Sequence, residues 1–243
     1  MSGTPADNQI LQDWPARVTS DRRNLDVTGC VNLRDLGGCP TRRGEVLATG
    51  RLFRGAAPPV APASAAGLVR VMGLRRVFDL RMDEEVEQAG APAFPEGCEW
   101  VRLPLFYTVR PDWPNPVDRS PAATAARYLE MAQDGAPAIA RVVELLGDVR
   151  SRPTLIHCVA GRDRTGIVIA CLLDLVDVPD AANAADYALS AIMDDAEGRT
   201  AHPDNILLLL QRIRERFGSV HEMLLAAGAS AAGIDRLHAA LMA

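Results

Sequence analysis

The pattern of hydrophobic and polar positions predicts strands that alternate with helices over the first two thirds of the chain. Short apolar runs at residues 74–81, 98–105 and 153–158 have the length of buried strands. Helical patterns lie at 62–73, before the first of these runs, and at 121–133 and 136–149, before the last. Alternation of this kind is typical of an α/β protein with a parallel sheet.

Two weaker strands and a helical end complete the expected fold. Residues 29–38 favour a short strand that ends in a Gly-Gly turn, and residues 44–56 favour a strand or hairpin arm. Four helical patterns fill the chain after residue 179. We therefore expect one α/β domain over 25–243, with a mainly parallel central sheet flanked by helices and a helical C-terminal part. A polar, flexible arm over 1–24 would precede it.

Local signals place the ends of one helix and one long loop. Ser64 is a candidate N-cap for the helix at 62–73, and Gly73 is its expected C-terminal stop. The segment 106–120 holds three prolines and two aspartates, which predicts a long loop. Loops of this length in a compact domain are often functional.

Composition excludes several classes of protein. The net charge of −5 gives no global basic field for nucleic acid or for an anionic membrane, so anion chemistry requires a local cluster. All 26 basic residues are arginine. The cysteines are odd in number and lack a C-x-x-C spacing, which argues against a disulfide framework and a zinc site. They are Cys30, Cys39, Cys98, Cys158 and Cys171.

The chain carries no mark of membrane insertion. Its N-terminus lacks a basic region followed by an apolar one, so we see no Sec-type signal. No apolar run approaches the roughly 20 residues of a spanning helix. We therefore expect a cytoplasmic protein without stable membrane insertion, although export by another route would leave no such mark.

The residues from His157 to Gly166, HCVAGRDRTG, form a polar and basic loop between a predicted strand and a predicted helix. Ligands of α/β sheets gather at the carboxyl ends of parallel strands. A loop that leads into a helix N-terminus presents unpaired N–H groups and the positive end of the helix dipole. Gly161 permits close approach of the backbone, and Arg164 offers two parallel donors to phosphate oxygens. The loop therefore predicts a phosphate site.

The side chains of this loop predict chemistry as well as binding. Cys158 lies at the base of the cup, where positive surroundings favour the nucleophilic thiolate. We expect His157 to shape the loop and the Thr165 hydroxyl to stabilise the sulfur as a leaving group. Asp163, which phosphate binding alone does not need, would protonate the leaving alkoxide and then activate water. The expected phosphate-binding residues are Val159, Ala160, Gly161, Arg162, Thr165 and Gly166.

The loop resembles the cysteine-phosphatase signature His-Cys-x5-Arg-(Ser/Thr). Its longer form resembles the bacterial tyrosine phosphatase family that includes the mycobacterial protein tyrosine phosphatase B enzymes. Other segments resemble motifs of that family, and together they span residues 29 to 241. They are NLRDLGG at 32–38, RLFRGA at 51–56, FDLRMDEE at 78–85, ADYALS at 185–190 and GSVHEMLLAAGAS at 218–230.

The resemblance implies a cysteine-phosphatase-like fold and a tyrosine phosphatase that forms a phosphocysteine without a metal or other cofactor. By position, Cys158 would be the nucleophile, Arg164 the phosphate clamp and Asp163 the acid. Members of the family act on phosphotyrosine, and some also act on phosphoserine/threonine or phosphoinositides, so the substrate would be a phosphorylated protein or a phospholipid. Arg162 stands where the family usually has lysine, a position linked with phosphoinositide activity.

Several alternatives stay open at this point. No Trp-Pro-Asp acid loop is present, so Asp112 and Asp118 of the long loop are second candidates for the acid, or else simple solvated carboxylates. The protein could instead be a phosphate-binding module without catalysis or a persulfide-transferring enzyme. Neither the physiological substrate nor the oligomeric state follows from the sequence.

Charged residues also gather near the predicted strand ends. We interpret them as ion pairs that pin the turns; the alternative is a layer of support around the cup, with Arg34 or Arg54 touching substrate. These residues are Arg34, Asp35, Arg54, Asp79, Arg81 and Glu85.

Overall fold

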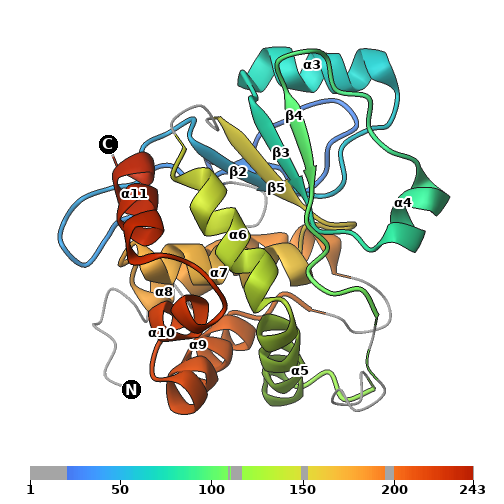
Figure 1. Cartoon of the computed structure of the whole chain (residues 1–243). Coiled ribbons are helices and arrows are strands. Elements are labelled where there is room, and N and C mark those ends of the chain that lie inside the picture. The colour runs from blue at the N-terminus through green and yellow to red at the C-terminus, as the bar shows by residue number, and fades with distance from the viewer. Residues whose placement is uncertain (1–20, 109, 111–116, 149–152, 195–199, 243) are drawn as a thin grey trace.

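The computed structural model describes residues 21–108, 110, 117–148, 153–194 and 200–242, which fold around a five-stranded sheet (Figure 1). The strand order is β1-β2-β5-β3-β4; β2, β5, β3 and β4 are parallel, and β1 runs antiparallel to β2 at one edge. The expected, mainly parallel sheet is therefore confirmed. Its strands are β1 (Arg34–Asp35), β2 (Leu52–Gly55), β3 (Arg76–Asp79), β4 (Glu99–Arg102) and β5 (Thr154–His157).

Successive strand residues face two different apolar layers, because side chains alternate across a strand. Leu155 of β5 and Val77 of β3 belong to a smaller cluster that includes residues of α3 (Pro62–Met72). Their neighbours Ile156 and Phe78 belong to the larger core with the other helices. The sheet is thus buried on both faces, with α3 on one side and the main helical layer on the other (Figure 1).

The helical layer is formed mostly by the C-terminal half of the chain, which confirms the expected helical C-terminal part. α7 follows the central strand and is buried continuously from Thr165 to Leu173. α5 packs on α9, and α6 packs on α11. The helices are α4 (Asp83–Ala89), α5 (Pro121–Asp134), α6 (Ala136–Leu146), α7 (Asp163–Leu175), α8 (Asp180–Ala188), the 3-10 helix η2 (Leu189–Met193), α9 (Asp204–Phe217), α10 (Val220–Ala226) and α11 (Ala231–Leu241).

Two local details differ from the prediction. Ser64 is not the N-cap of α3: Ala61 occupies that position without a side-chain bond, and Pro62 begins the helix, where its fixed φ is favourable. Gly73 ends the helix in the left-handed conformation, as expected. The short helix α4 was not predicted, because seven residues are too few to display a helical period.

The end of the arm predicted over 1–24 contacts the domain. The Asp35 N–H donates to the Arg23 carbonyl at 3.0 Å, and the Arg23 guanidinium lies 3.2 Å from Asp186. Residues 1–20 lie outside the described residues. Arg23 therefore joins the chain before the sheet to a residue of α8.

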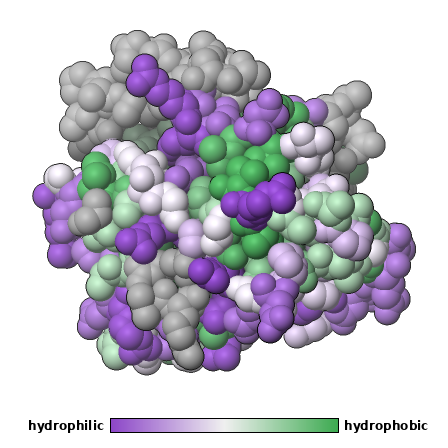
Figure 2. Space-filling view, turned by 90° about the horizontal axis from the view of Figure 1, so that it is seen from above, coloured by the Kyte–Doolittle hydropathy of each residue, from purple (hydrophilic) through white to green (hydrophobic). Residues whose placement is uncertain are grey.

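Figure 2 views the molecule from above Figure 1, with hydrophilic residues around the margin and a hydrophobic area towards the middle. Scattered exposed apolar side chains, such as Val71 of α3, are usual on protein surfaces. Within the ranges given above, no helix is both long enough and apolar enough to cross a membrane.

Candidate active site

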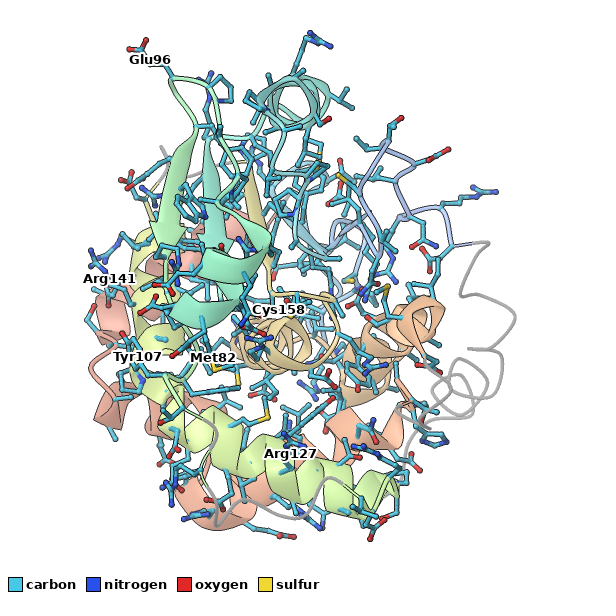
Figure 3. All side chains as sticks on the ribbon, turned by 90° about the vertical axis from the view of Figure 1, so that its right-hand side faces the viewer. Met82, Glu96, Tyr107, Arg127, Arg141 and Cys158 are labelled. Carbon is cyan, nitrogen blue, oxygen red and sulfur yellow. The ribbon has the colours of Figure 1, made fainter. Side chains whose placement is uncertain are left out.

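The HCVAGRDRTG loop connects β5 to α7 at the carboxyl end of the central strand. The neighbouring strands end at the same edge, because Gly55 of β2 and Asp79 of β3 both pair with His157. The segments that follow three parallel strands therefore meet around the loop, at the edge where α/β proteins bind ligands. Figure 3 shows Cys158 near the middle of the molecule, between the sheet and α5.

Most backbone N–H groups of the loop have no hydrogen-bond acceptor among the described residues. In the described part of the chain, residues 159–161 donate to no backbone or side-chain acceptor, and the first bond of α7 runs from the Gly166 N–H to the Arg162 carbonyl at 2.8 Å. The N–H groups of residues 163–165 therefore lack an intrahelical acceptor. With the positive end of the α7 dipole, these donors form a cup that suits a tetrahedral dianion.

Side chains from the N-terminal segment orient the peptide units of the loop. The Asn32 amide donates to the Ala160 carbonyl at 3.0 Å, and Nη2 of Arg54 donates to the Gly161 carbonyl at 2.9 Å. The N–H and C=O of a trans peptide unit point in opposite directions. By holding these two carbonyls on one side, Asn32 and Arg54 turn the N–H groups of the following residues to the other side.

Gly161 is required by conformation and by space. Its φ is +67°, a region that residues with a Cβ seldom adopt. A Cβ at this position would lie 2.2 Å from the carbonyl carbon and oxygen of Gly55 at the end of β2. The loop can therefore approach the neighbouring strand only with glycine at this position.

A buried ion cluster lies beneath the loop. Asp186 of α8 accepts from Nε of Arg34 at 3.0 Å and from Nη1 of Arg54 at 2.7 Å, and all three side chains are almost fully buried. Burial works against the charged carboxylate, but Arg34, Arg54 and Arg23 more than offset it and hold the pKa of Asp186 well below its ordinary value. Asp186 thus fixes the arginine that holds the Gly161 carbonyl.

The remaining charged residues near the strand ends divide between the two interpretations. Asp79 and Arg81 form a buried pair with an Nη2–Oδ2 distance of 2.7 Å, which pins a turn. Arg34 and Arg54 instead bind Asp186, and Arg54 also holds the loop. The sequence showed Asp186 only as part of the ADYALS motif and gave no sign of this contact. The fully buried Arg54 side chain contacts the phosphate loop by donating to a backbone carbonyl, that of Gly161.

The thiol and the hydroxyl of the loop are both buried. Cys158 is 3% exposed, and the Oγ1 atom of the fully buried Thr165 has no hydrogen-bond partner among the described residues. A buried hydroxyl without a partner is unfavourable by about 1–3 kcal/mol. The Thr165 hydroxyl is therefore able to donate a hydrogen bond to a group that enters the cup, or to the Cys158 sulfur when the sulfur is negatively charged.

His157 lies behind the loop and not in the cup. Its Nδ1 is 3.0 Å from the Cys158 carbonyl, and its Nε2 is 3.8 Å from Asp79. Complete burial lowers the pKa of His157, although the charge of Asp79 works in the opposite direction. A neutral imidazole in this place can shape the loop, as expected, but cannot reach a substrate.

Arg164 points to Glu85 of α4. Both terminal nitrogens of the guanidinium bond to the carboxylate, with Nη2 2.7 Å from Oε1. Burial opposes the charge of Arg164, but the bonds to Glu85 raise its pKa above the ordinary value. The Phe106 ring stacks on the guanidinium, with 5.7 Å from Cζ to the ring centroid. Glu85 and Phe106 therefore fix the orientation of the arginine at the rim of the cup.

Asp163, the first residue of α7, ends a chain of hydrogen bonds. Tyr128 of α5 donates to its Oδ1 atom, the hydroxyls of Tyr128 and Tyr187 are 2.9 Å apart, and the Asn205 amide donates to the Tyr187 oxygen at 3.1 Å. Because Tyr128 gives its only hydroxyl proton to the Asp163 carboxylate, Tyr187 is left to donate to Tyr128, and the Tyr187 oxygen accepts from Asn205. The Asp163 side chain is 40% exposed, whereas the other three residues are buried.

The side chain of Arg162 turns away from the cup. Its Nη1 donates to the Met193 carbonyl of η2 at 2.7 Å, its Nε lies 3.4 Å from Asp163, and the side chain is 3% exposed. The guanidinium therefore does not line the phosphate cup in this structure. The backbone of Arg162 can still contribute to the cradle.

A cavity of about 250 Å³ opens beside Asp163 and Arg164. Its apolar lining includes Met82, Phe106 and Met131, and its polar lining includes Asp118, Arg119, Thr124 and Arg127. In Figure 3, Met82 and Arg127 lie on either side of this region, below Cys158. The cavity thus adjoins the cup on the side of Asp163 and Arg164.

The two alternative acids have different positions. Asp112 lies outside the described residues. Asp118 lines the cavity, is exposed, and accepts from the Ser120 N–H at 2.8 Å, a bond that lowers the pKa of Asp118. Of the described candidates, Asp163 belongs to the phosphate loop itself, whereas Asp118 lies on the cavity wall before α5.

These features define the class of protein: an α/β fold that presents a cysteine beneath an anion-binding loop at the carboxyl end of its central strand. Residues 25–243 match a model described as the tyrosine phosphatase family. The chain therefore belongs to the tyrosine phosphatase family, which confirms the resemblance found in the sequence.

Three relatives illustrate the match. The triple specificity protein phosphatase PtpB of Mycobacterium tuberculosis is 29% identical over 198 residues, which are 68% of each chain. A putative tyrosine-protein phosphatase of Cupriavidus necator, H16_A0669, is 32% identical over 194 residues, 76% of this chain and 70% of the relative. A tyrosine-protein phosphatase of Nostoc commune is 31% identical over 121 residues, 49% of this chain and only 41% of the relative's length.

Among solved structures, TpbA of Pseudomonas aeruginosa is similar at 17% identity and a TM-score of 0.42, over 86% of this chain and 99% of that one. The core catalytic domain of the yeast PP-IP phosphatase SIW14 has a TM-score of 0.43 at 15% identity, over 79% of this chain and 95% of that one.

Proposed function

We propose that the protein hydrolyses phosphomonoesters, phosphotyrosine first, through a phosphocysteine on Cys158. The observation that carries the proposal is the set of open N–H donors around a buried cysteine, at residues 159–161 and 163–165. Donors in this arrangement would bind the three non-bridging oxygens of a phosphate and favour the thiolate below it. Arg164 adds a charged donor at the rim.

In the first step, the Cys158 thiolate attacks phosphorus, a sulfur–phosphorus bond forms, and the bond to the ester oxygen breaks. The leaving oxygen takes a proton from Asp163. Tyr128 donates to Oδ1 of that carboxyl, whereas Oδ2 has only the longer contact of 3.4 Å with Nε of Arg162, so we assign the proton to Oδ2. The side chain is partly exposed and borders the cavity, where a leaving group would lie.

In the second step, water attacks the phosphocysteine and gives a proton to the Asp163 carboxylate. The sulfur–phosphorus bond breaks, inorganic phosphate is released, and the Cys158 thiolate is regenerated. The unpartnered Thr165 hydroxyl would donate to the departing sulfur. Every role in the cycle is filled by a group of the chain itself.

An aryl ester suits the site better than a small polar one. The cavity beside Asp163 has an apolar lining that includes Met82, Phe106 and Met131, against which an aromatic ring can pack. Relatives with the names of tyrosine phosphatases favour the same substrate. PtpB is named a triple specificity phosphatase, so phosphoserine/threonine peptides and phosphoinositides belong in the comparison.

We further propose a cytoplasmic location. All five cysteines are free, which suits a reducing compartment. Cell fractionation with an antibody to the chain tests this, and recovery from the culture medium would contradict it.

The experiment that tests the function replaces the nucleophile. Cys158→Ser should abolish hydrolysis of a generic aryl phosphate and still bind phosphate or vanadate, because the donors of the cup remain. Hydrolysis by this variant would refute the mechanism. Binding without turnover in the wild type would favour a phosphate-binding module, and sulfur transfer from thiosulfate would favour a persulfide-transferring enzyme.

A further inference from the structure

Two arginines in the cavity beside the phosphate cup have no hydrogen-bond or ion-pair partner among the described residues. Arg119, just before α5, and Arg127, on α5, line the same cavity as Asp163 and Arg164. In the described chain, neither guanidinium has a hydrogen bond or an ion pair, although both side chains are partly buried. By contrast, Arg164 is paired with Glu85. Arg127 rises from α5 towards the region of Cys158 in Figure 3.

Three arginines and three carboxylates line the cavity, but two of the carboxylates are already paired. Glu85 is engaged by Arg164, and Asp163 lies 3.4 Å from Nε of Arg162, which does not line the cavity. Asp118 also lines it, but its carboxylate accepts from the Ser120 N–H and makes no ion pair with either arginine. Two unpaired guanidiniums therefore face one carboxylate. A partly buried charge without a partner favours the arrival of an opposite charge.

We propose that Arg119 and Arg127 bind a second anionic group of the substrate, a carboxylate or phosphate on a residue near the phosphotyrosine. The inference rests on the proposed function and adds a substrate class, acidic phosphotyrosine peptides. Guanidinium groups bind carboxylate and phosphate oxygens in pairs. The apolar lining of the cavity suits an aromatic ring and not a polyhydroxylated inositol, which favours a peptide over a lipid headgroup.

The test measures a ratio of specificity constants. Phosphotyrosine peptides with glutamates on both sides of the phosphotyrosine are compared with the same peptides carrying glutamines. The wild type should prefer the acidic peptide by about tenfold or more, the usual effect of one charged hydrogen bond. Arg127→Gln and Arg119→Gln should each reduce the ratio, and Arg127→Glu should invert it in favour of a peptide with lysines. Asp118→Asn, which removes a competing carboxylate, should raise it.

Arg141→Gln is the matched control. Arg141 is an exposed arginine of α6 that does not line the cavity, and Figure 3 shows it at the margin of the molecule. This variant has the same change in net charge and should keep the wild-type ratio. An equal loss in the control would attribute the preference to the overall field and overturn the inference.

The outcomes separate this inference from the proposed function. No hydrolysis of any phosphotyrosine substrate by the wild type would refute the function itself. Hydrolysis of both peptides with equal constants, unchanged in Arg127→Gln, would refute the second anionic site alone. A phosphoinositide in vesicles that is preferred over the acidic peptide, and that loses its advantage in Arg127→Gln, would assign the two arginines to a lipid headgroup and contradict the peptide.

Discussion

The hydroxyl of Tyr128 donates a hydrogen bond to the carboxylate of Asp163, and so joins α5 to the first residue of the helix that follows the phosphate loop. Tyr187 and Asn205 continue the chain of hydrogen bonds into the core. The proposed acid, which is 40% exposed, is thereby held by a buried partner. We infer that Tyr128 is a positioning residue for the proposed proton transfer.

Tyr128→Phe should therefore impair reactions that need the acid. The loss of a hydrogen bond to a charged group is worth about 1.5–3 kcal/mol, so we expect at least about a tenfold loss of kcat for aryl phosphates with poor leaving groups. Substrates with good leaving groups, which depart without a proton, should be affected little. The slope of log kcat against the leaving-group pKa measures the difference.

A double-mutant cycle with Asp163→Asn distinguishes positioning from general damage. Tyr128→Phe should have little further effect on kcat once the acid is gone. Tyr107→Phe, at a tyrosine that is 70% exposed, is the control. Equal losses from Tyr128→Phe in both backgrounds would show that the residue acts only through the fold, and a wild-type slope in Asp163→Asn would favour Asp118 or Asp112 as the acid.

Glu85→Gln should weaken the phosphate clamp. Glu85 bonds both terminal nitrogens of Arg164 and fixes the guanidinium at the rim. We expect vanadate affinity and kcat/KM for an aryl phosphate to fall by about tenfold, the effect of a lost charged hydrogen bond. Tighter vanadate binding by the variant would contradict this, because it would mean that Glu85 competes with the phosphate for Arg164.

Asp186→Asn should destabilise the fold and disorganise the loop. The change leaves Arg34 and Arg54 buried without their carboxylate, and removal of one partner from a buried ion cluster costs about 3–5 kcal/mol. Urea unfolding gives the loss, and an equally stable variant would show that the cluster is not stabilising. Asp83→Asn, at a carboxylate that is 63% exposed in its pair with Arg102, should cost less than about 1 kcal/mol.

Asp186 should also make the free energy of unfolding fall as the pH is lowered. Folding lowers the pKa of Asp186 below its ordinary 3.8, so the unfolded chain binds its proton at a higher pH than the folded one. The stabilisation is complete above that value and is lost as the pH falls below it. Between pH 5 and pH 3 the wild type should lose more unfolding free energy than Asp186→Asn; an equal loss would assign the acid sensitivity to other groups.

The phosphate loop could be predicted because its chemistry is contiguous in sequence. From His157 to Gly166, one strand end, one glycine and one helix start supply the proposed nucleophile, the N–H donors and the proposed acid. The sheet could be predicted for a similar reason, since its strands are short apolar runs. Each of these signals lies within about ten residues.

The groups that orient the loop could not be predicted in the same way. Tyr128 and Asn205 lie on helices far from the loop in sequence, and in an apolar helical pattern either reads as an ordinary helix residue. Asp186 and Tyr187 stood inside a motif of the family, but only the fold shows that one holds Arg54 and the other holds Tyr128. Side chains that meet through tertiary packing leave no local signal.

The central claim is that phosphate passes through Cys158, and trapping the intermediate tests it most directly. Asp163→Asn slows the attack of water, while an aryl phosphate with a good leaving group can still react in the first step. Rapid acid quench of this variant during turnover, followed by peptide mass spectrometry, should find phosphate on the peptide that contains Cys158, and none in Cys158→Ser. Phosphate on another residue, or turnover with no phosphorylated peptide at any time, would contradict the account.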